Sequence, residues 1–272
     1  METVWNDCDG FMRVLSFETA TYFGGVGYLA PGVRDGAGPF APRAASSEVL
    51  AAADTLLSRH GCAFEELDLI AVSTGPGLFT GVRVGLSIAK TLTWAQGGDR
   101  RLALVPVPTL DAVAVLGAQR IETPQETPSP LVAVTDARRG EVYAALFTCR
   151  SAQTPPERLT EDLVARPDQI LERLLDLLPD KGASIREQGR IVWIGDGAEK
   201  YPDMLGASFA GQNVVLPRGD ANLALCVAEL AVARLKAGDM AEAEAVRPHY
   251  VRRPDARLPV VQSYLSPGLG RE

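Results

Sequence analysis

The stretch that decides the fold is LDLIAVSTGPGLFTGVRVGLSIAKTL, residues 67–92. Its opening, LDLIAVS, is almost wholly apolar, as in a strand that is buried on both faces of a sheet. From Thr80 onward, Val82, Leu86 and Ala89 recur at helical spacing, which predicts a helix over about 80–96. A buried strand that leads directly into a helix is the repeating unit of α/β proteins, so an α/β fold is expected.

Neighbouring segments extend this unit on both sides. Residues 13–30 hold two apolar runs joined by a threonine-rich turn, which predicts a β-hairpin. Residues 31–46 are rich in Gly, Pro and Ala and form either a loop or a third strand with a long connection. A helix is predicted over about 47–59, and a strand, a proline-bounded turn and another helix over 102–118. The first half of the chain is therefore one α/β unit.

The second half repeats this order. QRIETPQETPSP, residues 119–130, has the Pro, Thr and Gln content of a linker. After it, LVAVTDARRGEVYAALF again predicts two strands joined by a tight turn, and the turn carries an acid as in the first half. A helix near 167–178, the strand RIVWIGDG and a long helix over 221–238 follow, so we predict a duplicated α/β architecture. The predicted organisation is a tail (1–12), a first domain (13–118), the linker, and a second domain (131–272) whose last segment is a candidate to pack back on the first.

Composition and charge favour a cytoplasmic globular protein without a nucleic-acid surface of its own. The 272 residues carry a formal net charge of −7, and the basic residues occur in scattered pairs rather than as a stripe. Four cysteines lie far apart without a CxxC pair, which indicates reduced thiols. The first residues lack the basic start of a signal peptide, and no apolar run reaches the ~18 residues that a membrane helix needs. We therefore expect any RNA to be held by a partner.

Three motifs are candidates for contact with a phosphate or a nucleotide. A strand that ends in glycines and leads into a helix exposes backbone N–H groups to an anion, although TGPGLFTG matches neither GxGxxG nor GxxxxGK[ST]. The turns FETAT and TDARRGE each place an acid after an apolar strand, and two such turns facing one another across a cleft can hold a Mg²⁺-bound nucleotide. The Gly-Asp-Gly step in IGDGAEKY is a candidate to approach an adenosine. The candidate residues are Glu18, Thr19, Gly75, Gly77, Thr80, Asp136, Arg138, Gly195, Asp196 and Gly197.

Each of these motifs also has a purely structural interpretation. Gly75, Gly77 and Gly81 can serve tight packing or a positive φ alone. Thr19 and Asp136 are residue types that make turns without any ligand. The residues by themselves leave both interpretations open.

Catalytic constellations are poorly represented in this sequence. The two histidines, His60 and His249, allow neither HxxxH nor HExxH spacing, so a zinc site built from helical histidines is not predicted. Ser73 and Ser87 lack the sequence context of a nucleophile elbow. No catalytic residue is therefore predicted.

Seven motifs together resemble a known family. VLSFETAT, SSEVLAAADTLL, the long stretch quoted first, VPTLDAVA, DARRGEVYAALF, IGDGAEKY and RPHYVRR occur in the order expected of the bacterial TsaB family of tRNA threonylcarbamoyladenosine biosynthesis, also called YeaZ. The resemblance covers most of the chain after about Arg13. It implies an actin-like, Hsp70-like (ASKHA) fold, duplicated in two α/β domains.

The resemblance also implies a role and a set of partners. Members of the family are thought to be non-catalytic subunits that pair with a paralogous threonylcarbamoyl transferase, assisted by a small ATPase, and that meet tRNA only through this complex. The paralogue carries two metal-binding histidines after its GPGL region, whereas this chain reads VPVPTLDAVAVL there. We therefore expect no metal and no cofactor required by the chain itself, with ATP or ADP and Mg²⁺ at the interface of the complex.

The resemblance places the pairing surface on helices of the first domain, and small apolar residues there permit close approach of helices. The same surface is expected to form a homodimer when the partner is missing. Two residues depart from the family pattern: Glu18 stands where Asp is common, and Ser46 where His is common. The interface candidates are Val49, Ala52, Ala53, Leu56, Val82, Gly85, Leu86, Ala89 and Leu92.

Two other functions remain as alternatives at this point. An autonomous ATP-dependent phosphotransferase of the same fold would use Glu18 and Asp136 as its acids. A glycoprotease-like metallopeptidase would need metal ligands, and the missing histidine pair argues against it.

Overall fold

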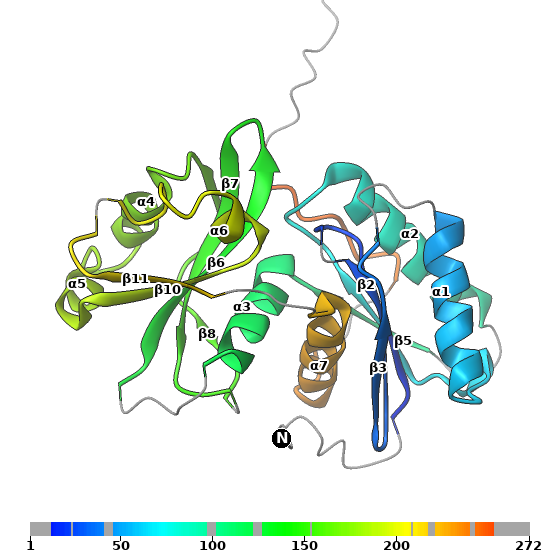
Figure 1. Ribbon diagram of the computed structural model, residues 1–272. Helices are drawn as coiled ribbons and strands as arrows, with labels where there is room; N and C mark the ends of the chain where they lie inside the picture. The colour runs from blue at the N-terminus through cyan, green and yellow to red at the C-terminus, as the bar shows by residue number, and fades with distance from the viewer. Residues whose placement is uncertain are drawn as a thin grey trace, which may run out of the picture.

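Two α/β halves lie side by side, each built on one sheet (Figure 1). The computed structural model describes residues 12–22, 24–40, 46–96, 102–121, 127–152, 154–207, 209–216, 221–239 and 243–252. The predicted tail therefore lies outside the described residues, apart from Met12. The predicted linker falls between the end of one helix and the start of the next strand, and residues 122–126 of it are outside the described part.

The first half is a five-stranded mixed sheet in the order β3-β2-β1-β4-β5. The predicted hairpin forms β1 and β2, and the Gly- and Pro-rich segment after it contributes a third strand rather than only a loop. β1 pairs in parallel with β4, and β4 with β5, because helices connect these strands. The strands are β1 (Val14–Glu18), β2 (Gly25–Ala30), β3 (Val33–Ala37), β4 (Leu69–Ser73) and β5 (Ala103–Val107). Helices α1 (Ser46–Arg59) and α2 (Phe79–Ala95) pack on one face through a shared apolar core.

The second half repeats this topology. Its sheet has the order β11-β10-β6-β7-β8, and the short strand β9 also pairs with β7. We count β8 and β9 as one interrupted edge strand and read the second sheet from that edge. Two antiparallel pairings are then followed by two parallel ones, as from β3 to β5 in the first sheet. The strands are β6 (Ser129–Arg138), β7 (Glu141–Cys149), β8 (Glu157–Arg158), β9 (Leu163–Ala165), β10 (Arg190–Ile194) and β11 (Gln212–Leu216). The predicted duplication is confirmed, and the arrangement is the actin-like α/β fold.

Two helices cross between the halves. α3 (Thr109–Gln119) follows the first sheet in the chain but packs on β6 and β10 of the second. α7 (Leu223–Lys236) follows the second sheet but packs on β1, β2 and β4 of the first. The two helices also contact one another, and one apolar core joins the inner faces of both sheets around them. The halves are therefore tied together by packing as well as by the connecting segment.

The outer face of the second sheet carries short helices that the sequence did not reveal, apart from α4. α4 (Ile170–Asp176) lies within the helix predicted near 167–178, while α5 (Ala183–Gln188) and α6 (Asp196–Lys200) are too short to show a periodic pattern. In the first half, the 3₁₀ turn Phe64–Glu66 before β4 is too short for the same reason. Among the described residues, no helix combines the length and the apolar character that crossing a membrane requires.

Candidate functional site

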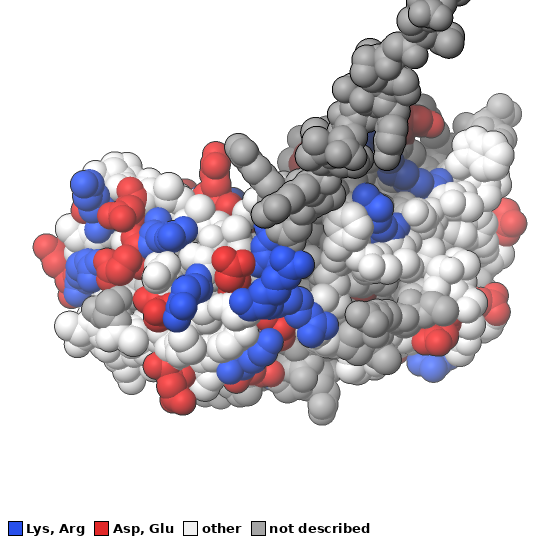
Figure 2. Space-filling model, turned by 90° about the horizontal axis from the view of Figure 1, so that it is seen from above, with Lys and Arg blue, Asp and Glu red and all other residues white. Residues whose placement is uncertain are grey.

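A cavity of about 420 Å³ opens between the two halves. Three segments line it: the glycine-rich turn at 76–79, the end of β6 with the hairpin turn at 136–139, and residues 249–252 near the C-terminus. Figure 2 shows Lys and Arg side chains gathered along the middle of the face seen from above. The fold thus brings the glycine-rich turn and the second hairpin turn to one place.

Glu18 lies at the end of β1 and is fully buried. Its Oε1 accepts hydrogen bonds from the backbone N–H groups of Ala20 at 2.7 Å and Thr21 at 3.1 Å. Its Oε2 accepts from the Thr21 hydroxyl at 2.7 Å, and the Ser73 hydroxyl donates to Oε1 at 3.2 Å. Burial raises the pKa of Glu18 despite these bonds. The Glu18 carboxylate, a candidate for contact with a nucleotide, therefore folds back onto its own turn and does not face the cavity.

The glycine-rich turn packs tightly against the first hairpin turn. A Cβ on Gly77 would lie 2.3 Å from the Ala20 carbonyl oxygen, and one on Gly81 would lie 1.9 Å from that of Thr19. Leu78 N–H donates to the Ala20 carbonyl at 2.7 Å, and the Thr19 hydroxyl donates to the Gly81 carbonyl at 2.6 Å. These contacts support the structural interpretation of the glycines, since the space that an anion would need is filled by the chain itself.

Other backbone groups of the glycine-rich turn also have partners. Gly75 N–H donates to the Thr109 hydroxyl at 3.1 Å, and Thr74 N–H donates to the Val107 carbonyl at 2.9 Å. Thr80 is exposed at the start of α2. Strand β5 and helix α3 thus take up the N–H groups of Thr74 and Gly75, at the start of this turn.

Asp136 and Asp196 meet at the carboxyl ends of β6 and β10. Asp136 N–H donates to Asp196 Oδ1 at 3.0 Å, and Lys200 Nζ lies 2.8 Å from Asp136 Oδ2. Gly195 and Gly197 are buried against Val134 at the same strand end, where β10 leads into α6. The Gly-Asp-Gly step therefore holds the end of β6, and the carboxylate of Asp136 is neutralised by a lysine rather than facing the cavity unpaired.

Asp196 makes the stability of the chain depend on pH. Burial, with smaller contributions from the Asp136 and Glu18 carboxylates, raises its pKa from 3.8 to about 7. Between about pH 4 and pH 7 the unfolded chain loses a proton that the folded chain retains, so the free energy of unfolding falls as pH rises across this window. A pKa difference of about three units between the folded and unfolded chains corresponds to about 4 kcal/mol in the free energy of unfolding. Because Asp196 keeps some contact with water, we expect a change of about 2 kcal/mol.

We therefore expect Asp196→Asn to be more stable than the wild type by about 2 kcal/mol at about pH 8 and nearly equal to it at about pH 4. Urea unfolding at both pH values measures the difference. An identical pH dependence for the two chains would show that Asp196 ionises normally.

A segment near the C-terminus bridges the halves, and the sequence did not single it out as part of the site. His249 N–H donates to the Thr74 carbonyl at 2.8 Å, and His249 Nε2 lies 2.9 Å from Asp162 Oδ2 in the second half. Arg252 pairs with Glu141 and donates to the Ala137 carbonyl. RPHYVRR carried the family resemblance, but its position in the cavity wall is visible only in the folded chain.

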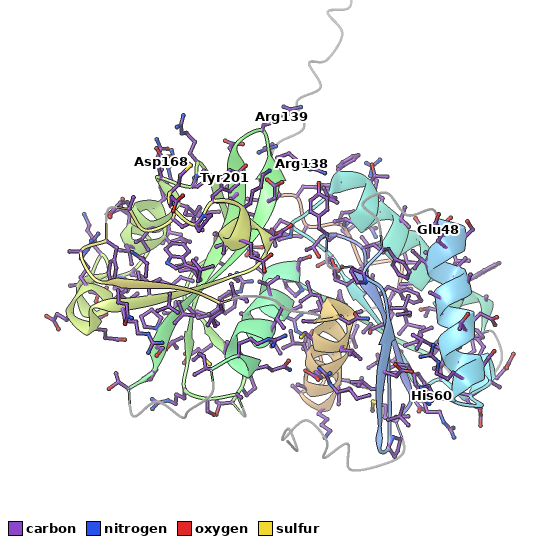
Figure 3. The ribbon with its side chains drawn as sticks, in the orientation of Figure 1. Glu48, His60, Arg138, Arg139, Asp168 and Tyr201 are labelled. Carbon is purple, nitrogen blue, oxygen red and sulfur yellow. The ribbon has the colours of Figure 1, made fainter. Side chains whose placement is uncertain are left out.

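Arg138 and Arg139 form the tip of the β6–β7 hairpin, with Arg138 on the side toward the first half (Figure 3). Both are exposed, and the Arg138 guanidinium lies 4.6 Å from the ring centre of Tyr22 in the first hairpin turn. Among the described residues, no group of three or more His, Cys, Asp or Glu side chains is arranged to hold a metal ion. The chemistry present at the cavity mouth is thus that of arginines and aromatic rings.

The predicted interface residues need correction. Of the nine candidates, Ala52 and Leu92 are partly exposed, and the other seven belong to the core of the chain itself. The helical pattern that selected them marks the face that packs on the first sheet, so a partner cannot use these side chains. The seven buried residues are Val49, Ala53, Leu56, Val82, Gly85, Leu86 and Ala89. The large apolar side chains that α1 and α2 do expose are Leu50, Phe79 and Trp94.

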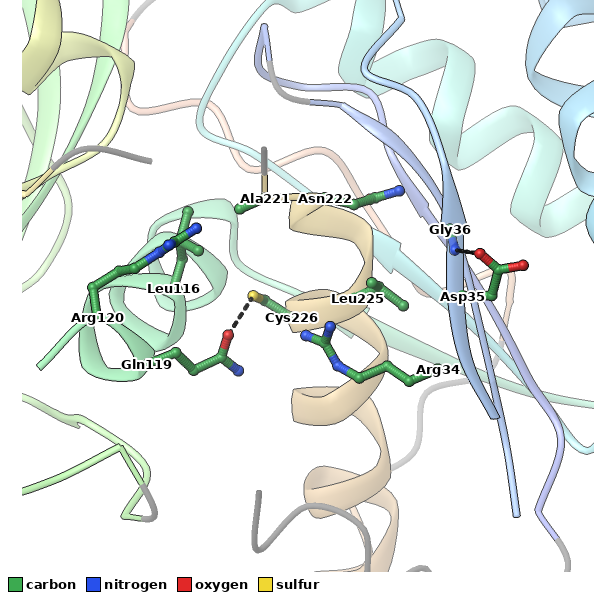
Figure 4. Close-up of a pocket in the computed structure, with 10 residues that line it drawn as sticks. All are labelled: Arg34, Asp35, Gly36, Leu116, Gln119, Arg120, Ala221, Asn222, Leu225 and Cys226. Atoms are coloured by element: carbon green, nitrogen blue, oxygen red, sulfur yellow. Dashed lines mark hydrogen bonds between the residues drawn. The ribbon is translucent and has the colours of Figure 1, made fainter. Parts of the chain in front are cut away.

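A second cavity of about 610 Å³ lies where α3, α7 and β3 meet (Figure 4). Arg34 Nε pairs with the buried Glu229 at 2.9 Å, and Gln119 Nε2 donates to the same carboxylate at 2.7 Å. Cys226 is buried beside Gln119, and burial raises the pKa of its thiol. The cysteines Cys62, Cys149 and Cys226 are all free and buried, as expected for unreactive thiols.

This architecture defines a class: a duplicated actin-like α/β protein with a cavity between its halves. A family model described as "TsaD: tRNA N6-adenosine threonylcarbamoyltransferase" matches residues 38–258. The TsaB protein of Escherichia coli is 30% identical over 193 residues, which cover 71% of this chain and 75% of the relative. The TsaB protein of Haemophilus influenzae is 25% identical over 247 residues, covering 89% and 94%. The chain therefore belongs to the family that the model describes, and within it to the TsaB or YeaZ proteins.

Structural comparison agrees with this assignment at the level of the fold. YeaZ from Pseudomonas aeruginosa superposes with a TM-score of 0.68 at 23% identity, covering 88% of this chain and 99% of that one. A tRNA N6-adenosine threonylcarbamoyltransferase of Streptococcus pneumoniae is 35% identical over 97 residues, which cover 36% of this chain and 27% of the transferase. This pairwise match to the transferase covers only a part of each chain, whereas the family model spans residues 38–258.

Proposed function

We propose that this chain is a non-catalytic scaffold subunit in tRNA threonylcarbamoyladenosine biosynthesis and that it pairs with the paralogous transferase. The relatives that cover most of its length are named for this biosynthesis, and the transferase shares a segment with it. The proposal includes a cytoplasmic location, contact with a small ATPase subunit, ATP or ADP with Mg²⁺ at the interface of the complex, and a homodimer when the partner is missing.

The observation that carries the non-catalytic role is the position of the Glu18 carboxylate. It accepts two backbone N–H groups of the first hairpin turn, and such groups are the donors that a turn offers to a phosphate. A phosphotransferase needs those donors for its nucleotide. Here an internal carboxylate, rather than a phosphate, accepts the hydrogen bonds of those donors. This supports a scaffold rather than an autonomous phosphotransferase.

The outer surface of α1 and α2 is the docking face in this proposal. Leu50 is 40% exposed and Trp94 is 82% exposed, on two helices that lie beside one another. Exposure of a large aromatic side chain to water is unfavourable in free energy, and such side chains are common anchors of protein interfaces. These two side chains replace the buried residues that the sequence had suggested for the interface.

Reconstitution of the modification reaction tests both parts of the proposal. Threonine, bicarbonate, ATP, the adenylate-forming enzyme, the transferase and the small ATPase are combined with tRNA, with and without this chain, and threonylcarbamoyladenosine is measured by mass spectrometry of nucleosides. We expect the product to be lost on omission and restored by the wild type. The double variant Leu50→Asp, Trp94→Ala is expected to restore less than about a tenth, because a charge and a missing anchor cost at least ~1.4 kcal/mol of binding.

Leu177→Asp is the matched control, since this leucine is 50% exposed in the second half. It should restore the product as well as the wild type does. Sedimentation of the chain with the transferase separates a loss of pairing from a loss of folding. Product that is unchanged on omission would overturn the scaffold role, and measurable ATP turnover by the isolated chain would favour the phosphotransferase.

A further inference from the structure

Two arginines from different halves lie over aromatic rings at the interdomain cavity: Arg138 lines the cavity, and Arg83 contacts two of its lining residues. Arg83 of α2 lies 4.0 Å from the ring centre of Phe79, and its Nε donates to the Tyr250 hydroxyl at 3.0 Å. Arg138 lies over Tyr22 in the same manner. Within the described part of the chain, neither arginine pairs with a carboxylate. A guanidinium that stacks on a ring keeps its in-plane N–H groups available for two parallel bonds to a phosphate.

The backbone of the hairpin tip is unusual at Arg138. Arg138 and Arg139 have φ values of 64° and 56°, and Gly140 follows with 77°. Hairpin turns of this kind favour Asn, Asp or Gly, because a side chain with a Cβ is strained at positive φ by about 1 kcal/mol or more. A tip that carries arginine at these positions bears this strain at an exposed site. The strain is consistent with a requirement for positive charge at the tip.

The neighbourhood of these arginines suits a particular anion. Lys200 and Arg252 are neutralised by Asp136 and Glu141, so they contribute little net charge. Phe79 and Tyr250 are 54% and 42% exposed, and their rings stack with centres 5.2 Å apart. Arginine beside exposed aromatic rings is the combination with which proteins hold RNA, through phosphate contacts and base stacking.

We propose that the mouth of the interdomain cavity binds the phosphodiester backbone of the RNA substrate, with Arg83 and Arg138 each contacting a phosphate and the Phe79–Tyr250 pair offering a stacking surface. The proposal rests on the function proposed above, and it goes beyond the expectation that RNA is held by the partner alone. The chain carries a net charge of −7, so this attraction is local.

The test uses the complex of the full chain with its transferase. Binding of labelled tRNA is measured by fluorescence anisotropy between about 50 mM and about 300 mM salt. For Arg83→Ala, Arg138→Ala we expect about tenfold weaker binding and a slope of log K against log salt that is shallower by about 1 to 2. Arg83→Lys, Arg138→Lys should keep most of the slope but lose part of the affinity, because lysine lacks the planar fork.

Arg173→Ala, Arg186→Ala is the matched control, because it removes two exposed arginines of the second half far from the cavity. It should leave affinity and slope unchanged. Equal tRNA binding by the cavity variant and the wild type would overturn the proposal. Weaker binding of ATP with unchanged tRNA binding would also overturn it, because the site would then hold a free nucleotide.

The two proposals can fail separately. If the cavity variant binds tRNA normally while omission of the chain still abolishes the modification, the scaffold role stands and the RNA contact is wrong. If omission has no effect, the proposed function fails whatever the affinity of the complex for tRNA.

Discussion

Replacement of Glu18 by alanine is expected to lower the free energy of unfolding by about 3 kcal/mol. Four donors lose their acceptor in this variant: the N–H groups of Ala20 and Thr21 and the hydroxyls of Thr21 and Ser73. Each unsatisfied buried donor costs about 1 to 3 kcal/mol, and relief of the buried charge, whose pKa burial raises, offsets a part of the sum. Urea unfolding near neutral pH measures the loss.

The same variant tests whether the carboxylate occupies a place that an anion could take. Without it, the N–H groups of the turn have no acceptor, so about 10 mM inorganic phosphate should raise the melting temperature of Glu18→Ala more than that of the wild type. Glu18→Gln retains one acceptor oxygen and should lose about half as much stability. An alanine variant as stable as the wild type would show that the carboxylate does not hold this turn. If phosphate raises the melting temperatures of both chains equally, the turn does not bind an anion even after the carboxylate is removed.

Replacement of Gly81 by alanine is expected to have the largest effect on stability, about 3 to 5 kcal/mol, or to prevent folding. The new Cβ would lie 1.9 Å from the Thr19 carbonyl oxygen, so the start of α2 must move away from the first hairpin turn. That movement breaks the bond from the Thr19 hydroxyl to the Gly81 carbonyl. The expression level of folded protein and its urea midpoint measure the effect.

Gly61→Ala is the control for this variant. Gly61 has a φ of 60° and no atom within 4 Å of its Cβ position, so alanine there should cost only about 1 kcal/mol of backbone strain. A similar loss in both variants would mean that backbone strain, rather than the contact with Thr19, decides the effect at Gly81. Wild-type stability of Gly81→Ala would overturn the close approach itself.

Much of the fold could be predicted from local patterns. The strands at 14–30, 69–73 and 129–149 follow from apolar runs broken by turn residues, and α1, α2 and α7 follow from helical spacing. The short elements β8, β9, α5 and α6 could not, because two to six residues are too few to show a period. The crossing of α3 and α7 between the halves was also invisible, since an apolar helix shows that it is covered but not by which sheet.

The arrangement of the candidate residues was only partly visible in the sequence. The two acid-bearing turns and the glycine-rich turn do lie close together in the structure. The inward orientation of Glu18 could not be predicted, because a pattern names a residue type and not its rotamer. Seven interface candidates were wrong because small apolar residues serve a sheet contact and a partner contact equally well. The role of Arg83 could not be foreseen, since 55 residues separate it from Arg138 in the chain.

The sequence by itself determined the class of this protein: two α/β halves with alternating strands and helices, and motifs in the order of the TsaB family. Period and turn chemistry are local properties, so they can be read without a fold. Only the tertiary structure decided that the Glu18 carboxylate closes its own turn and that α1 and α2 bury their apolar stripes and expose Leu50 and Trp94. It also decided that Arg138 lines the interdomain cavity and that Arg83 contacts the lining residues Phe79 and Tyr250. These outcomes depend on which surfaces close against one another, and that is set by packing between segments far apart in the chain.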